Sequence, residues 1–251
     1  MIFLATDFGL TGPYLGQVRA VLAQRCPEQA VIDLFADLPV FQPALSAPLL
    51  AAYTRDLPSG SLVLGVVDPD VGGERDGVIL QADGLWFVGP DNGLFSLVAR
   101  WARERAAWRL SVPPGASASF HGRDVFAPAA AILARGGLPE GTTVLDPGRL
   151  DRPDFPNDLP RIIYLDTYGN ALTGIRASSL GPHDTLALES SVLPRARTFC
   201  DLDKGEPFCY RNANGLMEIA VNQGRADQKL ALHLGTPVRV IAATAGVSVR
   251  G

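Results

Sequence analysis

Short apolar runs alternate with segments of helical spacing from the N-terminus up to Glu140. The runs that predict strands are Ile2–Thr6, Ala30–Phe35, Ser61–Val67, Gly77–Gln81 and Leu85–Val88. The segments that predict helices are Pro13–Gln24, Ala44–Tyr53, Leu94–Arg105 and Asp124–Arg135. The run Ser61–Val67 is apolar almost throughout, as is typical of a strand buried on both faces. Together these segments predict an α/β domain with a mostly parallel central sheet.

The pattern changes after this domain. Residues 153–160 combine prolines with acidic residues and predict a linker. The segments that follow are short and strand-like, without a long helical stretch: Arg161–Leu165, Thr185–Leu188, Leu216–Val221 and Pro237–Ala242. We therefore expect an N-terminal α/β domain over residues 1–152 and a smaller, all-β, barrel-like C-terminal domain over residues 161–251.

Composition narrows the class of protein. Apolar residues make up 47% of the 251 positions and charged residues 19%, which excludes a disordered chain. A formal net charge of −4 argues against general nucleic-acid binding. No apolar run is long enough to span a membrane, and the polarity of Met1–Gly9 does not fit a signal peptide. These features predict a cytoplasmic protein that binds neither nucleic acid nor membranes.

The sequence lacks the common metal-binding and nucleotide-binding motifs. The three cysteines, Cys26, Cys200 and Cys209, form no CxxC pair, and there are only three histidines. We therefore expect reduced thiols, no disulfide and no metal site. The sequence contains neither GxGxxG nor GxxxxGK[ST], so a Rossmann dinucleotide site and a Walker site are excluded.

Acidic residues follow two of the predicted strands. Asp7 ends the first strand, where an acid can accept hydrogen bonds from a ribose diol or simply cap a turn. Asp68 follows Ser61–Val67, in a loop that also contains glycines and Arg75. Asp68 and Arg75 can form an ion pair across this loop, either at a pocket or as a structural salt bridge.

Other segments can contribute polar groups. His121 stands between an aromatic residue and a glycine, just before a predicted helix, and is a candidate for catalysis. Pro90–Gly93 is a turn signal that also supplies helix capping. In the C-terminal part, Asp166–Asn170 and Asn212–Gly215 can carry polar site groups or be plain turns, and Glu218–Gly224 is typical of a strand that leads into a loop.

These segments together resemble the S-adenosylmethionine hydroxide adenosyltransferase family, which is related to the fluorinase and chlorinase enzymes. The matching strings, in order, are TDFG (6–9), VVDPDVGGER (66–75), FVGPDNGLF (87–95), FHGRDVFAPAAA (120–131), YGN (168–170) and EIAVNQGRA (218–226). The resemblance implies an α/β domain, a β-barrel and a homotrimer with active sites between subunits. It also implies hydrolysis of S-adenosylmethionine (SAM) to adenosine and L-methionine, with water or hydroxide attacking the ribose 5′ carbon.

The resemblance assigns roles to individual residues. Asp68, Arg75 and His121 are its catalytic set, and no cofactor besides the substrate is implied. Residues that the resemblance places at the substrate are Asp7, Phe8, Asp166, Asn170, Asn214, Asn222 and Gln223. Asp7 would bind the ribose hydroxyls, and Asn170 is a candidate for adenine recognition.

The sequence departs from the family pattern at two positions. Gly12 stands where members commonly have a second acid in a DxGxxD pattern, and Ala213 stands where they commonly have serine. By resemblance, both positions face the methionine half of the substrate. A non-catalytic adenosine- or SAM-binding protein is therefore the alternative. A halogenase is a further alternative, although Asp68, Arg75 and His121 together favour water over halide.

Overall fold

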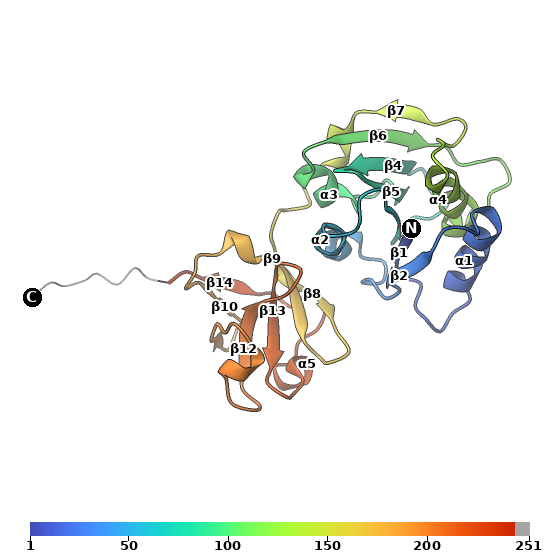
Figure 1. Ribbon diagram of the computed structural model, residues 1–251. Coiled ribbons are helices and arrows are strands. Elements are labelled where there is room, and N and C mark those ends of the chain that lie inside the picture. The colour runs from blue at the N-terminus through green and yellow to red at the C-terminus, as the bar shows by residue number, and fades with distance from the viewer. Residues whose placement is uncertain (244–251) are drawn as a thin grey trace, which may run out of the picture. The chain divides into compact units, whose positions relative to one another are not determined.

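The computed structural model describes residues 1–243 and divides the chain into two units, Met1–Phe155 and a second one from Pro156 onward (Figure 1). The first unit is built on a seven-stranded sheet in the order β2-β1-β3-β5-β4-β6-β7. Its strands are β1 (Ile2–Thr6), β2 (Val31–Phe35), β3 (Leu62–Val66), β4 (Gly77–Ala82), β5 (Leu85–Pro90), β6 (Arg105–Leu110) and β7 (Thr143–Leu145). Strands β2, β1, β3 and β5 pair in parallel, and β4, β6 and β7 continue the sheet antiparallel.

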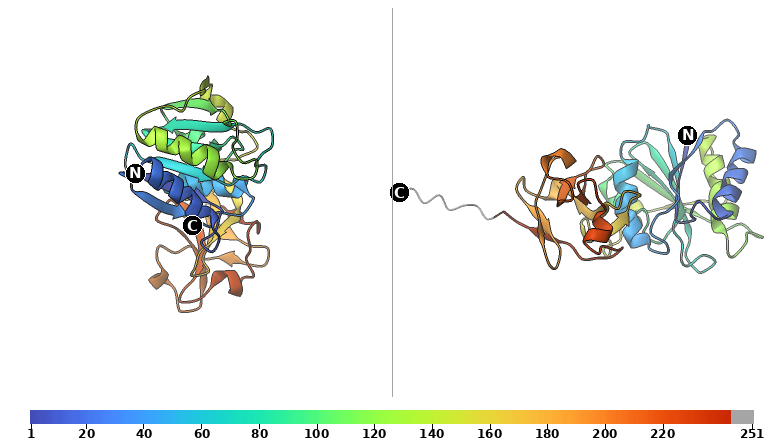
Figure 2. Two further views of the ribbon diagram at one scale, coloured as in Figure 1. Left: turned by 90° about the vertical axis from the view of Figure 1, so that its right-hand side faces the viewer. Right: turned by 90° about the horizontal axis from the view of Figure 1, so that it is seen from below.

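Helices cover both faces of this sheet. In both views of Figure 2, α1 (Tyr14–Arg25) and α4 (Ala127–Ala134) lie side by side on one face. On the other face lie α2 (Pro43–Thr54) and α3 (Ser96–Trp101). Helix α1 buries Leu15, Val18 and Leu22, whose spacing of three and four residues places them on one side of the helix.

The predicted helix Leu94–Arg105 is wrong in its second half. Helix α3 ends at Trp101, and Arg105–Leu110 is strand β6 between β4 and β7. The sequence of β6, RAAWRL, has the composition of a helix, and its pairing with two strands overrides that preference. The indole of Trp108 in β6 stacks on that of Trp86 in β5, with ring centroids 5.6 Å apart and planes at 25°.

The predicted helix Asp124–Arg135 consists of two segments. A π-helical turn over Gly122–Phe126 leads directly into α4, which has Pro128 in its first turn, where a missing N–H costs no hydrogen bond. The π-helical turn begins immediately after His121, the candidate catalytic histidine. Such turns widen a helix locally and are frequent at functional sites.

The second unit contains two antiparallel sheets. One has the order β12-β13-β9-β8 and the other β11-β10-β14. The elements are β8 (Leu159–Leu165), β9 (Ala171–Arg176), β10 (Thr185–Ala187), β11 (Val192–Leu193), β12 (Pro207–Arg211), β13 (Leu216–Val221), the short helix α5 (Ala226–Lys229) and β14 (Arg239–Ile241). The four predicted strands correspond to β8, β10, β13 and β14, whereas β9, β11 and β12 were not predicted. The predicted fold class, an α/β domain followed by an all-β domain, is confirmed.

Candidate active site

The two acids that follow predicted strands lie at the same edge of the first sheet. Strands β1 and β3 are parallel neighbours, and Thr6 of β1 pairs with Val66 of β3. Asp7 and Asp68 therefore leave adjacent strands at their carboxyl ends, where ligands bind in open α/β sheets. The electrostatic effect of Asp68 contributes to a raised pKa of Asp7, although burial of the Asp7 carboxyl is the larger cause.

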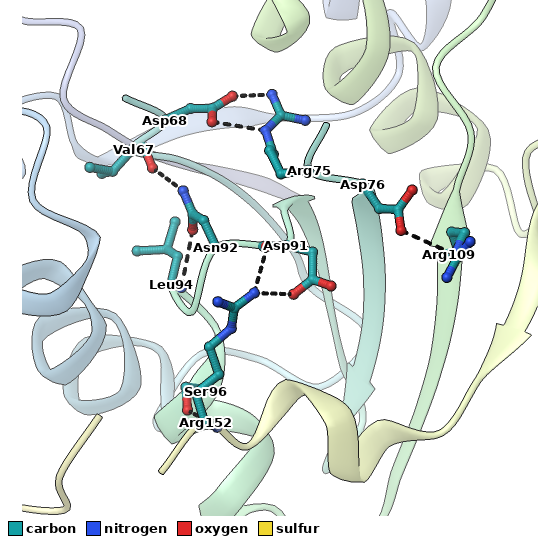
Figure 3. A network of polar contacts seen from close by, with 10 residues as sticks. All are labelled: Val67, Asp68, Arg75, Asp76, Asp91, Asn92, Leu94, Ser96, Arg109 and Arg152. Atoms are coloured by element: carbon teal, nitrogen blue, oxygen red, sulfur yellow. Dashed lines mark hydrogen bonds and ion pairs between the residues drawn. The ribbon is translucent and has the colours of Figure 1, made fainter. Parts of the chain in front are cut away.

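Asp68 and Arg75 form a buried, bidentate ion pair (Figure 3). The Arg75 Nε donates to Asp68 Oδ1 at 2.9 Å, and Nη2 donates to Oδ2. Their side chains are only 9% and 5% exposed. The loop between them turns at Gly72, which has φ +81° and approaches the Ala118 carbonyl so closely that a Cβ would clash with it. The loop thus holds Arg75 back against Asp68.

His121 completes this cluster. Arg75 Nη2 lies 2.9 Å from His121 Nδ1. A guanidinium has only donors, so Nδ1 accepts, and a neutral imidazole then carries its hydrogen on Nε2. Burial lowers the pKa of His121, and the positive charge of Arg75 lowers it further. The geometry and the electrostatics both favour a neutral His121 with an Nε2–H donor.

The third nitrogen of the Arg75 guanidinium, Nη1, makes neither of these contacts. Arg75 Nη1 is buried and has no hydrogen-bond partner among residues 1–243. In Figure 3 it points away from Asp68. A buried charged donor without an acceptor is costly. Part of the Arg75 charge therefore stays uncompensated beside Asp68 and His121.

A cavity of about 310 Å³ opens in front of the cluster. Its wall is mainly aromatic and aliphatic and also carries two carboxylates, an imidazole and a phenol. It consists of Asp7, Phe8, Tyr14, Val40, Phe41, Val66, Asp68, Val71, Ser119, Phe120, His121 and Gly122. The rings of Phe8, Tyr14 and Phe120 contact one another. Arg75 is not part of the wall but lies behind Asp68 and His121. The cavity can hold a flat, apolar ligand that carries hydroxyl groups.

Phe41 is a cavity residue that the sequence analysis missed. Its backbone has φ +60°, unusual for a bulky residue, and the residue is 69% exposed. The Phe41 N–H donates to Asp7 Oδ2 at 3.0 Å and so binds one of the two carboxylate oxygens. The available signal is indirect: in a parallel sheet, the loop after Ala30–Phe35 reaches the same sheet edge as Asp7. Strain of this kind is found where a surrounding structure fixes a functional site.

The Pro90–Gly93 turn stabilises the loop of the ion pair. The Asn92 amide donates to the Val67 carbonyl at 2.7 Å and accepts from the Leu94 N–H at 3.3 Å (Figure 3). Asp91 accepts a hydrogen bond from Arg152 at 3.0 Å. This turn therefore supports the residue that precedes Asp68, and its own side chains do not line the cavity.

The candidate residues of the second unit fall into two groups. Asn170 and Gln223 line one cavity of about 540 Å³. Asp166 binds both the backbone N–H and the amide of Asn170, at 2.8 and 2.9 Å, and so holds it in place. The Asn222 amide instead donates to the Leu202 carbonyl at 2.7 Å, and Asn214 lies in a turn outside the cavity wall.

Neither a metal site nor a membrane-spanning helix is found in residues 1–243. No group of three or more His, Cys, Asp or Glu side chains is arranged to hold a metal ion within that range. No described helix is long and apolar enough to cross a membrane. Within the same range, Cys26, Cys200 and Cys209 are free thiols.

The fold and the cluster define a two-unit α/β and β protein with a buried Asp-Arg-His site at a sheet edge. Residues 2–143 match the model of the SAM hydroxide adenosyltransferase N-terminal domain, and residues 160–239 match that of its C-terminal domain. The chain belongs to the SAM hydroxide adenosyltransferase family. The resemblance drawn from the sequence motifs is thereby confirmed.

Individual relatives cover nearly the whole chain. An (R)-S-adenosyl-L-methionine hydrolase of Thermus thermophilus is 40% identical over 96% of this chain and 99% of its own length. A fluorinase of Nocardia brasiliensis is 22% identical over 96% of each chain. Among solved structures, an uncharacterized conserved protein from Thermotoga maritima matches with a TM-score of 0.80 and 26% identity, over 96% of this chain and 99% of that one.

Proposed function

We propose that this protein hydrolyses SAM to adenosine and L-methionine. The observation that carries the proposal is the buried Arg75 guanidinium, which pairs with Asp68, contacts His121 and keeps Nη1 without a partner among residues 1–243. Family membership and the relatives named SAM hydrolase support the same reaction. The adjoining aromatic cavity with Asp7 suits a nucleoside.

The reaction requires alignment more than acid catalysis. The oxygen of water or hydroxide forms a bond to the ribose 5′ carbon, opposite sulfur. The carbon–sulfur bond breaks, its electron pair stays on sulfur as methionine leaves, and the proton of the attacking water passes to solvent. A sulfonium is already a good leaving group, so no general acid is needed. Positioning alone can contribute up to roughly 7–11 kcal/mol to such a step.

Each residue of the cluster has a distinct task in this reaction. The Nε2–H of neutral His121 donates to the attacking oxygen and holds it in line. Arg75 supplies a fixed positive charge that favours hydroxide over water, and Asp68 orients Arg75. One Asp7 oxygen receives the Phe41 N–H, so the other is left for the ribose hydroxyls, with Phe8 contributing to the cavity wall.

The second unit supplies the remaining contacts in our proposal. Asn170, held by Asp166, and Gln223 are its adenine-binding candidates, and Asn214 and Asn222 belong to the same substrate region. We propose that the protein is a cytoplasmic homotrimer, in which these residues bind the part of the substrate that extends from a neighbouring subunit's Asp7 cavity.

Mixing two inactive variants tests this arrangement. Asp7→Ala damages the first unit and Asn170→Ala the second, so each variant alone should turn over poorly. If each site combines units from two subunits, reassembled mixtures contain sites with both units intact and regain a substantial part of the activity. No recovery, in mixtures shown to exchange subunits, or full activity of a monomer contradicts the proposed assembly.

Incubation with SAM, followed by chromatography of nucleosides and amino acids, tests the reaction itself. We expect adenosine and methionine in equal amounts, and in ¹⁸O-labelled water the label should appear in the 5′ hydroxyl of adenosine. Added chloride should leave the products unchanged. A chlorinated nucleoside would identify a halogenase, and binding of SAM without any turnover would identify a binding protein.

The pH dependence of turnover should reflect the lowered pKa of His121. An ordinary histidine has a pKa of about 6.5. Because burial and the Arg75 charge lower the pKa of His121, its neutral form persists below that pH. Turnover that needs the neutral form should therefore be maintained through about pH 6.5 and fall only in more acidic solution. An NMR titration of the imidazoles, assigned with His121→Asn, should give the same inflection, and an inflection at or above pH 6.5 contradicts this role.

Gly12→Asp is expected to tighten SAM binding and to leave adenosine binding nearly unchanged. Gly12 is not in the left-handed region, and a Cβ there would lie 3.5 Å from the Tyr14 ring, an ordinary contact. A new carboxylate can therefore be accommodated and can pair with the ammonium group of the substrate, a contact of about 1.5–3 kcal/mol. Calorimetry with both ligands measures this, with Gly12→Asn as the uncharged control. Equal changes in both affinities would place residue 12 away from the amino-acid half.

A further inference from the structure

Glu218 is a buried carboxylate without a task in the chemistry proposed above. It lies in β13, between β12 and β9, and pairs with Tyr210 on one side and Leu172 on the other. The residue is only 5% exposed. A carboxylate at the centre of a sheet is costly unless its oxygens accept hydrogen bonds. The hydrogen-bond partners of Glu218 therefore indicate its role in the structure.

One partner of Glu218 is an amide that forms a turn. The Asn212 Nδ2 donates to Glu218 Oε2 at 3.0 Å. An ionised carboxylate only accepts, so it fixes which end of the Asn212 amide faces it. The opposite end, Oδ1, then accepts from the backbone N–H groups of Asn214 and Leu216, both at 3.0 Å. Glu218 thus sets the conformation of the Asn212–Gly215 turn, which contains the substrate candidate Asn214.

The other partner of Glu218 is part of a cavity wall. The Tyr210 hydroxyl donates to Glu218 Oε1 at 2.6 Å. The Tyr210 ring lines the same cavity as Asn170 and Gln223 and packs against the ring of Phe199, 5.4 Å between centroids. A single carboxylate therefore holds the turn with one oxygen and the cavity wall with the other.

We propose that Glu218 is a positioning residue for substrate binding, which fixes the Asn212–Gly215 turn and the Tyr210 wall relative to each other. This inference rests on the proposed function, because the second unit is taken to bind part of SAM. Glu218 itself does not line the cavity. Its effect should therefore appear in affinity, in KM for SAM and in Kd for adenosine, and much less in kcat.

Two substitutions at Glu218 separate positioning from charge. In Glu218→Gln the side-chain carbonyl can still accept from Asn212, and its amino group can donate to the Tyr210 hydroxyl oxygen. We expect KM and adenosine Kd to stay within about threefold of wild type. Glu218→Leu removes both acceptors, so the Asn212 amide can exchange the positions of its oxygen and its nitrogen. We expect KM and adenosine Kd to rise by about tenfold or more, with kcat within about threefold.

Matched controls account for lost stability. Asp158 forms an ion pair with Arg176 in the same unit, away from the cavity, so Asp158→Leu should lower Tm without changing KM. If Glu218→Leu does not fold, Tyr210→Phe and Asn212→Ala each remove one of the two bonds. Each should then raise adenosine Kd by a few-fold.

The outcomes distinguish this inference from the proposed function. Wild-type affinity in a folded Glu218→Leu protein, or in both partner variants, overturns the positioning role, as does a loss confined to kcat. If the wild type makes no adenosine from SAM, the proposed function fails. Adenosine binding then tests the role of Glu218 on its own: weaker binding in Glu218→Leu than in wild type supports the inference. Unchanged or absent adenosine binding overturns it.

Discussion

Replacing Arg75 by leucine should slow SAM hydrolysis by about 10²- to 10³-fold, the usual effect of removing one preorganised electrostatic group from an active site. Arg75 lies behind the cavity wall and contacts Asp68 and His121. Its charge therefore matters most when hydroxide character develops in the transition state. Adenosine should still bind within about threefold of wild type, because the cavity wall remains. Steady-state kinetics and adenosine calorimetry on the same preparation give both numbers.

The substitution also leaves Asp68 buried without its partner, which typically costs about 3–5 kcal/mol of stability. The melting temperature must therefore accompany the kinetics. Arg75→Lys keeps a charge but cannot bind both Asp68 oxygens and His121 at once, and it should show an intermediate rate. Arg109→Leu, which breaks the half-exposed pair with Asp76, the residue after Arg75, is the matched control and should leave the rate unchanged. Parallel losses of rate and adenosine affinity in Arg75→Leu would assign Arg75 to substrate binding.

Asp7→Ala is expected to weaken adenosine binding by about 10- to 150-fold, which corresponds to one charged hydrogen bond of about 1.5–3 kcal/mol. In the proposed binding mode, the Asp7 oxygen that does not accept from the Phe41 N–H binds the ribose hydroxyls. Wild type should therefore prefer adenosine over 2′-deoxyadenosine, and the variant should lose that preference. Calorimetry with the two nucleosides isolates this contact from any general damage to the cavity.

Asp7→Asn serves as the companion variant. Its carbonyl oxygen can still accept the Phe41 N–H, so the left-handed backbone at Phe41 should be retained. Its loss of affinity should then be smaller than that of the alanine variant. If both variants retain the preference for adenosine over 2′-deoxyadenosine, the ribose hydroxyls are bound by another residue.

The pattern of apolar residues predicted the most deeply buried strands of the first unit. It missed strands of the second unit that contain glycine or proline. Ile2–Thr6 is observed with the predicted bounds because every residue in it is buried. Strand β9 contains Gly174, where a Cβ would clash with Leu159, and β12 begins at a proline. Both residue types weaken a strand signal. Their strand conformation depends on neighbouring strands far along the chain, which local periodicity does not contain.

The candidate site could be predicted as a set of residues, including the Asp68–Arg75 ion pair, but not as a complete arrangement. The positions of Asp68, Arg75 and His121 pointed to ionisable groups on loops. The sequence did not reveal that Arg75 lies between the other two with a nitrogen to spare. Phe41 escaped notice because its role depends on a left-handed backbone and on an acid 34 residues away. Contacts of this kind follow from the tertiary fold and have no local signature.

The stacked indoles of Trp86 and Trp108 provide a spectroscopic signal that comes from the first unit and not from the second. All three tryptophans of the chain, these two and Trp101, belong to the unit Met1–Phe155. Fluorescence excited at the red edge of the absorption band therefore reports on that unit alone. Two indoles in such close contact also couple their transitions, which gives near-ultraviolet circular dichroism that vanishes when the strands carrying them separate. Melting of the Asp-Arg-His unit can thus be followed without any signal from its neighbour.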